Sequence, residues 1–260
     1  MAKRTSDAKR LQNLRVFNMV MGALHLVQGI LMLLLSSDFS LPVMTSFLEF
    51  DVETTMLVPN PEVLFDLRVG PLVAAFLLMS AAAHWIISLP RVFDWYAKHL
   101  KNGANYARWI EYAFSSSVMM LAIAMLAGIY DVVALLLMFF LNAAMILFGW
   151  AMERHNQLTK KTDWTSFVFG SIVGIVPWVA IAIYLFGAGG GEMGPPDFVY
   201  WIFFTIFLTF NTFALNMLLQ YKKVGKWENY LYGERAYIIL SLVAKSLLAW
   251  QVWGGTLRPV

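Results

Sequence analysis

One lysine and one glutamate lie in apolar segments where charged side chains are costly. Lys245 belongs to SLVAKSLLAW (241–250), and Glu111 belongs to YARWIEYAFSSSVMM (106–120). A cation at the centre of a bilayer costs roughly 3 kcal/mol on insertion scales. Such a lysine must face the interior of a helix bundle, pair with an anion or be modified. Glu111 is the obvious anion, because no other of the 16 acidic residues lies well inside an apolar segment.

Polar side chains stand one helical turn from each charge. Ser241 precedes Lys245 by four residues, and Ser115 follows Glu111 by four. Arg108 precedes Glu111 by three residues and so shares its helix face. Three interpretations remain open. The pair could join two helices, it could form a proton relay or transporter site, or a desolvated lysine could form a Schiff base with an aldehyde, with the carboxylate as counterion.

The composition predicts a membrane protein. The chain is 60% hydrophobic and 13% charged, whereas soluble domains are roughly 25% charged. Seven apolar segments exceed the roughly 20 residues that a helix needs to cross the hydrocarbon, and an open chain can cross lipid only as helices. We therefore predict an all-α membrane protein with a single seven-helix domain over 1–260, with helices near 16–36, 69–90, 106–127, 129–151, 165–187, 198–221 and 234–255.

Cationic residues gather on one side of the predicted membrane. They lie in the N-terminal tail and in the connections after the second, fourth and sixth helices, whereas the other side carries Arg68 and Arg258. The positive-inside rule predicts a multi-pass protein of the cell membrane with a cytoplasmic N-terminus and an extracellular C-terminus. The charges are spread over four segments, so they do not form a nucleic-acid footprint. Cysteine is absent, which excludes disulfides and thiolate metal sites.

The long connection at 37–68 is predicted to be extracellular. It is rich in acidic residues, and its runs LPVMTSFLEF and TTMLV contain apolar and β-branched residues. Such runs predict a short antiparallel β-ribbon. A flexible acidic loop is the alternative.

Seven helices with a lysine on the last and a carboxylate on the third are typical of rhodopsins. The chain resembles the heliorhodopsins over essentially its whole length. The segments that carry this resemblance are RWIEY with SSS (108–117), LNAAMILFGW (141–150), GIVPW (174–178), KWENYLYGERAY (226–237) and LSLVAKSLLAWQ (240–251). Heliorhodopsins have the N-terminus inside, unlike other microbial rhodopsins, and the loop charges predict that orientation independently.

The resemblance implies a retinal site. Lys245 would carry all-trans retinal as a Schiff base, and Glu111 would be the sole carboxylate counterion, with Ser241 and Ser115 near the linkage. The residues expected around the polyene are Tyr112, Met145, Gly149, Pro177, Trp178, Phe210 and Asn211. For each of these, ordinary helix packing is the alternative.

Two histidines are the other titratable groups inside the predicted membrane helices. His25 lies on the first helix, and His84 lies on the second, one turn after Ser80. Together with Arg108 they could form a polar network that takes up the Schiff-base proton transiently. The alternative is that the histidines are packing residues.

The resemblance implies a light sensor and not an enzyme. Proton pumps have a second acid four residues before the lysine, and this chain has Ser241 there. We therefore expect a homodimeric photoreceptor in the lipid bilayer that acts on a signalling partner, without nucleic acid. One alternative is a light-driven or light-gated proton conductor. Another is a retinal-free seven-helix transporter that uses the Lys–Glu site.

The loop charges generate a prediction about topology. A tag placed after Val260 should be reached by a membrane-impermeant label on intact cells, and a tag placed before Met1 should be labelled only after permeabilisation. The reverse labelling pattern would contradict the charge argument.

Overall fold

The protein is a bundle of membrane-spanning helices. A computed structural model describes the backbone of residues 2–188 and 194–258, and the side chains of these residues from Lys9 onward. Within them, seven helices are long and apolar enough to cross a membrane, which confirms the predicted fold class. They are α1 (Ala2–Leu35), α2 (Val69–Ile86), α4 (Tyr106–Leu126), α5 (Val132–Asn156), α6 (Thr165–Gly187), α7 (Asp197–Tyr221) and α8 (Tyr230–Val252), which continues as the π-helical turn η2 (Trp253–Leu257).

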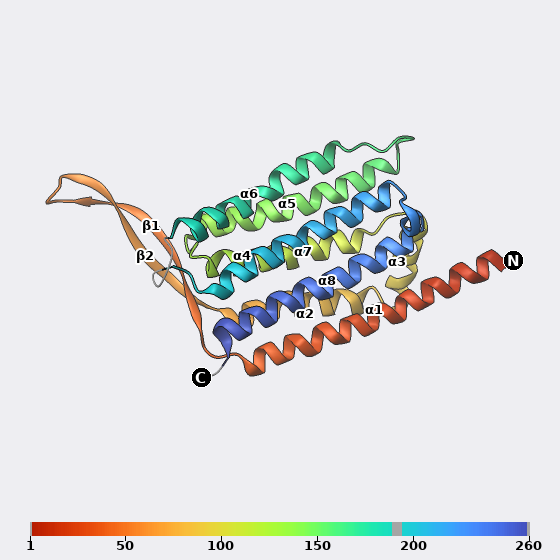
Figure 1. Cartoon of the computed structure of the whole chain (residues 1–260), viewed down its shortest axis with the longest axis horizontal. Helices are drawn as coiled ribbons and strands as arrows, with labels where there is room; N and C mark the ends of the chain where they lie inside the picture. Colours follow the sequence, from red (N-terminus) through yellow and green to blue (C-terminus); the bar gives the residue numbers. More distant parts are fainter. Residues whose placement is uncertain (1, 189–193, 259–260) are drawn as a thin grey trace.

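The helices lie side by side along one axis (Figure 1). Neighbours pack in the order α1–α2–α4–α5–α6, and α8 contacts α7, α1 and α2. The rings of Trp178 and Phe203 meet edge-on with centroids 5.8 Å apart and join α6 to α7. In α4, 61% of the apolar stretch lies inside the protein, against 28% in α1. Glu111 is therefore carried by the most enclosed of these helices.

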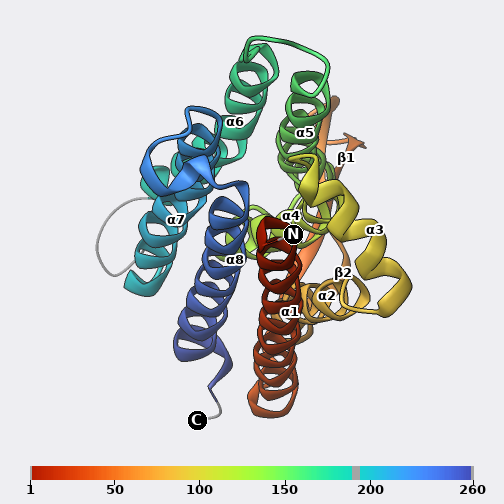
Figure 2. The same ribbon diagram turned by 90° about the vertical axis from the view of Figure 1, so that its right-hand side faces the viewer.

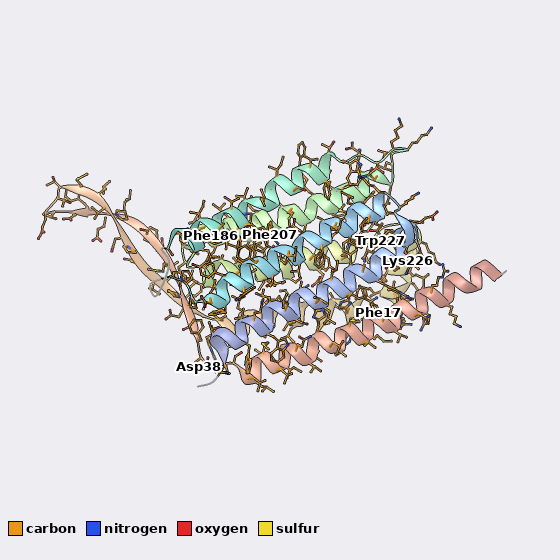
Figure 3. The ribbon with its side chains drawn as sticks, viewed as in Figure 1. Phe17, Asp38, Phe186, Phe207, Lys226 and Trp227 are labelled. Atoms are coloured by element: carbon orange, nitrogen blue, oxygen red, sulfur yellow. The ribbon has the colours of Figure 1, made fainter. Side chains whose placement is uncertain are left out.

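The two ends of the bundle differ in charge and shape. We call the end that holds the connections at 87–105, 157–164 and 222–229 the basic end, and the end that holds the β-strands the ribbon end. Figure 1 places the N-terminus at the basic end and the C-terminus at the ribbon end. Lys226 and Trp227 lie at the basic end, in the 3₁₀ turn η1 (Gly225–Glu228), and Asp38 lies at the ribbon end (Figure 3).

Side-chain caps set several helix starts. The Asn105 side chain accepts from the Arg108 amide at 3.1 Å, so α4 begins at Tyr106. Asp131 accepts from the Ala134 amide at 2.8 Å, and α5 begins at Val132, three residues later than the predicted 129. Asn229 caps α8 in the same way and starts it at Tyr230, four residues before the predicted 234. Capping oxygens satisfy amides that have no partner inside the helix.

A short amphipathic helix, α3 (Pro90–Lys101), lies in the connection between α2 and α4. Pro90 occupies its first turn, where the missing N–H costs nothing. Phe93, Tyr96 and Leu100 are buried against Leu14 of α1 and Ile238 of α8. Helix α3 was not among the predicted helices, because its 12 residues are too few to cross a bilayer.

The predicted antiparallel β-ribbon is confirmed, and it is longer than expected. β1 (Ser40–Asp51) pairs with β2 (Met56–Arg68) from Ser40↔Arg68 to Asp51↔Met56, with a bulge between Val43 and Met44. The base is attached to the bundle, because the Met44 amide donates to Tyr130 O at 2.8 Å. The rest extends away from the helices (Figure 1).

Candidate functional site

The structure brings Lys245 of α8 and Glu111 of α4 together in the interior. Lys245 Nζ lies 3.3 Å from Glu111 Oε1, and the two side chains are 4% and 10% exposed. The ammonium also donates to Ser241 Oγ at 2.9 Å, one turn earlier on α8. It lies 5.2 Å from the centre of the Tyr112 ring, close enough for a cation–π contact. The buried cation therefore has an anion, a hydroxyl and an aromatic face around it.

A hydroxyl from α2 holds the carboxylate from its other side. Ser80 Oγ donates to Glu111 Oε1 at 2.6 Å, so this oxygen receives both the serine hydroxyl and the lysine ammonium. Ser115 is buried one turn after Glu111, and within the described residues its hydroxyl has no hydrogen-bond partner. The two serines predicted to lie near the charges thus differ, since Ser241 bonds Lys245 directly, whereas Ser115 lies beside Glu111 without a well-formed hydrogen bond.

The two histidines lie next to the Ser80 side of the site. Their rings stack with centroids 5.6 Å apart. His84 Nδ1 is 2.7 Å from Asn18 Oδ1 of α1. His25 is fully buried, and neither of its ring nitrogens has a hydrogen-bond partner in the part of the chain that the structure describes. His25, His84 and Ser80 therefore form one polar region beside Glu111.

Arg108 belongs to a second buried cluster nearer the basic end. Its guanidinium donates to Glu153 Oε2 of α5 at 2.7 Å and forms an ion pair with Glu234 of α8. The Asn105 amide donates to Glu153 at 2.6 Å, and the Asn105 side chain donates to Glu234 at 2.6 Å. The guanidinium also lies 4.0 Å from the Tyr237 ring centre. We call Asn105, Arg108, Glu153 and Glu234 the arginine cluster.

Sequence reasoning did not find the arginine cluster. It assigned Arg108 to the face of Glu111, and Glu153 and Glu234 lie at the ends of predicted helices. Both carboxylates are buried, with side chains 4% and 1% exposed. The available signal was that all three charges lie at the same predicted membrane surface, where facing helix ends can meet.

A small cavity of about 40 Å³, with polar and charged residues among those that line it, lies between the two charged groups. Its wall includes His84 and Glu111 on one side and Arg108 and Glu234 on the other. A volume of this size can hold ordered water when polar partners line it. The charged pair and the arginine cluster are thus adjacent without a direct bond between them.

A largely apolar cavity of about 140 Å³ has Lys245 in its wall. Four of the residues predicted to surround a polyene line it: Tyr112, Met145, Gly149 and Phe210. Its wall also contains Trp109, Phe213 and Tyr237, which sequence reasoning did not select. A Cβ on Gly149 would lie 2.4 Å from Trp109 Cζ3, so glycine lets the indole pack against α5.

The other three predicted polyene residues lie outside this wall. Pro177 is buried inside α6. Trp178 contacts the cavity indirectly, because its ring packs edge-on against Phe210 with centroids 5.5 Å apart. Asn211 is exposed, and its amide donates to Phe207 O of its own helix at 2.8 Å.

Comparison with known proteins identifies the family. The sequence pattern described as Heliorhodopsin matches residues 14–257, nearly the whole chain. The chain belongs to the heliorhodopsin family. The resemblance found in the sequence is therefore confirmed, and membership identifies a retinal-binding rhodopsin with a multi-pass membrane architecture.

A solved rhodopsin structure is similar to this heliorhodopsin-family chain. It is the crystal structure of a light-driven proton pump, LR (Mac), from Leptosphaeria maculans, with a TM-score of 0.62. The match covers 96% of this chain and 95% of the pump at 14% sequence identity. At that identity the likeness shows the fold alone. No curated protein matches the chain in sequence.

The residues present suit retinal, the cofactor of rhodopsins. Retinal is a long, flat, apolar aldehyde, so its site needs an amine at one end and apolar walls along its length. In this heliorhodopsin-family chain Lys245 borders the apolar cavity, and aromatic rings and methionine form much of the wall.

The arginine cluster generates a prediction about stability. Arg108→Gln should lower the free energy of unfolding by about 3–5 kcal/mol, because it leaves Glu153 and Glu234 buried without their cation. The check is the thermal unfolding midpoint in detergent. Arg235→Gln is the matched control, since Arg235 is exposed at the same end of α8. Equal midpoints for both variants would contradict a structural role for the cluster.

Proposed function

We propose that the chain is a light sensor that binds all-trans retinal on Lys245 as a protonated Schiff base. Photoisomerisation would drive a conformational signal without net ion transport. The observation that carries this proposal is the position of Lys245, whose Nζ lies 3.3 Å from Glu111 Oε1 and whose side chain lines the apolar cavity. A structural ion pair would need the carboxylate but not the cavity.

Each residue of the site has a distinct proposed role. Bound retinal supplies visible absorption and a double bond that isomerises in light. Lys245 holds it covalently, and Glu111 balances the positive charge of the linkage. Tyr112, Met145, Gly149 and Phe210 form walls that restrict its orientation. Ser241 and Ser80 hold the lysine nitrogen and the carboxylate through hydrogen bonds of 2.9 Å and 2.6 Å.

The polar region around the histidines is proposed to hold a proton transiently. His84 follows Ser80 by one turn, and Ser80 bonds Glu111. The stacked ring of His25 has nitrogens without a hydrogen-bond partner among the described residues and no solvent-exposed surface. A proton that reaches these rings stays inside the protein, close to the carboxylate, and can return to it.

The parts of α4 and α8 that lie between the Lys245–Glu111 pair and the ribbon end support sensing over pumping. Vectorial transport needs proton donors and acceptors on both sides of the site. After Ser117, the rest of α4 reads VMMLAIAML, and after Lys245 the rest of α8 reads SLLAWQV, with no acid in either run. The Gln251 side chain in this region accepts from Thr205 Oγ1 at 3.1 Å. A proton therefore has no ionisable acceptor on these runs toward that surface.

Two alternatives remain distinct from this proposal. A light-driven or light-gated proton conductor would use the small cavity between Glu111 and the arginine cluster. A retinal-free transporter would use the Lys–Glu pair without a chromophore.

We further propose a homodimer with a cytoplasmic basic end, acting on a signalling partner there. The outer part of the ribbon supports an interface between copies, because Phe47, Leu48 and Phe50 are each more than half exposed. An isolated two-stranded ribbon is marginally stable in water. Burying these side chains against a second copy would stabilise it.

The covalent link generates the next prediction. Lys245→Ala should fold but remain colourless when retinal is added, because no other lysine lies at membrane depth. Lys222→Ala, at the basic end, is the control that should form the pigment. The measurement is the visible spectrum with and without hydroxylamine. A hydroxylamine-sensitive pigment in Lys245→Ala would refute the assignment.

Glu111→Gln should move the visible band to longer wavelength. The carboxylate stabilises positive charge at the lysine nitrogen in the ground state, and its removal narrows the energy gap of the chromophore. Chloride should partly reverse the shift by occupying the vacated anion position. Glu49→Gln, on the ribbon, is the matched control and should absorb as the unaltered protein does. An unchanged spectrum in Glu111→Gln would assign the counterion to another group.

Illumination should move no net charge across the membrane. Liposomes that contain the pigment should show neither a sustained change of external pH nor a steady photocurrent, with or without a protonophore. The colourless Lys245→Ala variant provides the baseline. A sustained, protonophore-sensitive pH change would favour the proton conductor instead.

A further inference from the structure

A continuous row of aromatic rings joins α3 to α5 at the basic end. The ring centroids of Trp95 and His99 are 4.7 Å apart, those of His99 and Tyr106 are 4.9 Å apart, and those of Tyr106 and Trp150 are 5.8 Å apart. The row therefore starts on α3, passes the first residue of α4 and ends on α5. We call these four residues the aromatic row.

Cationic side chains stand at both ends of the aromatic row. Arg91 and Lys98 are exposed on α3, one turn before and one turn after Trp95, and Arg154 is exposed on α5, one turn after Trp150. None of the three makes an ion pair within the described residues. Asp94 is the single carboxylate of α3. The surface is thus positively charged on both sides of a set of rings.

The backbone that carries this surface is held firmly. The opposite face of α3 is buried, with Tyr96 1% and Leu100 3% exposed. Arg15 of α1 donates to Ser88 O at 2.8 Å just before α3 and lies 5.0 Å from the Phe93 ring. Figure 2, which looks onto the basic end, shows α3 on the flank of the bundle between α2 and α5. The backbone positions of Arg91 and Lys98 are therefore fixed relative to the bundle.

The lipid-facing side of α5 continues from the aromatic row toward the membrane interior. Leu147, Trp150 and Arg154 follow at spacings of three and four residues, so they share one helix face. Leu147 is 44% exposed, and Phe140, two turns earlier, is 61% exposed. This face combines an apolar track with a cation in the order in which a phospholipid presents its chains and its phosphate.

We propose that this surface binds an anionic phospholipid, with its phosphate between Lys98 and Arg154 over the aromatic row and its chains along Leu147 and Phe140. Trp and Tyr side chains favour the membrane–water interface. Cationic side chains there attract anionic lipids, with about fivefold in affinity for each one near the surface. The surface does not include Lys245 or Glu111, so a test of lipid binding is independent of the retinal proposal.

The test is a lipid titration of the delipidated full-length protein followed by native mass spectrometry. The probes are phosphatidylglycerol and phosphatidylcholine with identical acyl chains. The unaltered protein should prefer phosphatidylglycerol, and Arg91→Gln/Lys98→Gln/Arg154→Gln should weaken that binding by roughly tenfold or more. The matched control is Lys222→Gln/Lys223→Gln/Lys226→Gln, which removes the same charge from the same end of the bundle and should keep the preference.

Further variants separate a specific site from general attraction. The charge-retaining Arg91→Lys/Lys98→Arg/Arg154→Lys should still bind phosphatidylglycerol, and the single change Lys98→Glu should weaken it even if the triple variant does not fold. Circular dichroism and the unfolding midpoint in detergent check folding. Equal losses in the two triple glutamine variants would overturn the proposal, and so would equal affinity for both lipids. Displacement of phosphatidylglycerol by millimolar inorganic phosphate would show that the surface recognises free phosphate and would also overturn it.

Discussion

A lysine ammonium in an apolar bundle needs an anion, and the structure of the site follows from that need. Lys245 is almost fully enclosed, so its partner must come from a helix that is itself enclosed. Glu111 meets this condition because α4 is the most buried of the spans. Desolvation of both charges is costly, and their attraction offsets it only when hydrogen bonds complete the arrangement. Ser241 and Ser80 supply those bonds, which ties α8 and α2 to the pair.

The arginine cluster applies the same rule nearer the basic end. Arg108 of α4 bonds Glu153 of α5 and Glu234 of α8, so one guanidinium connects three helices. Its planar fork can bind two carboxylates at once, which a lysine could not do with the same geometry. The small cavity between this cluster and Glu111 keeps the two charged groups close but separate. A change in the geometry of the Lys245–Glu111 pair can therefore reach the basic end through the adjacent arginine cluster.

The two ends of the bundle are built for different surroundings. At the basic end, α3 and η1 lie against the helices, and lysines and arginines face outward. At the ribbon end, β1 and β2 project beyond the helices and expose phenylalanine and leucine. In a seven-helix chain the termini must lie at opposite ends, so the two faces of the protein present different surfaces.

Hydropathy and charge by themselves determined the membrane class, the seven helices and the pairing of Lys245 with Glu111, because apolar length and isolated charge are strong local signals. The ribbon was also predictable from its β-branched runs, although its length was not. Contacts between distant segments were decided only by the tertiary structure. Arg108 shares a helix face with Glu111 in the sequence, yet facing helix ends bring it to Glu153 and Glu234. Likewise, Trp178 and Asn211 have suitable side chains for a cofactor wall, but helix rotation turns Asn211 outward and places Phe210 between Trp178 and the cavity. Helix rotation and the meeting of helix ends depend on packing among all seven helices, which no single segment specifies.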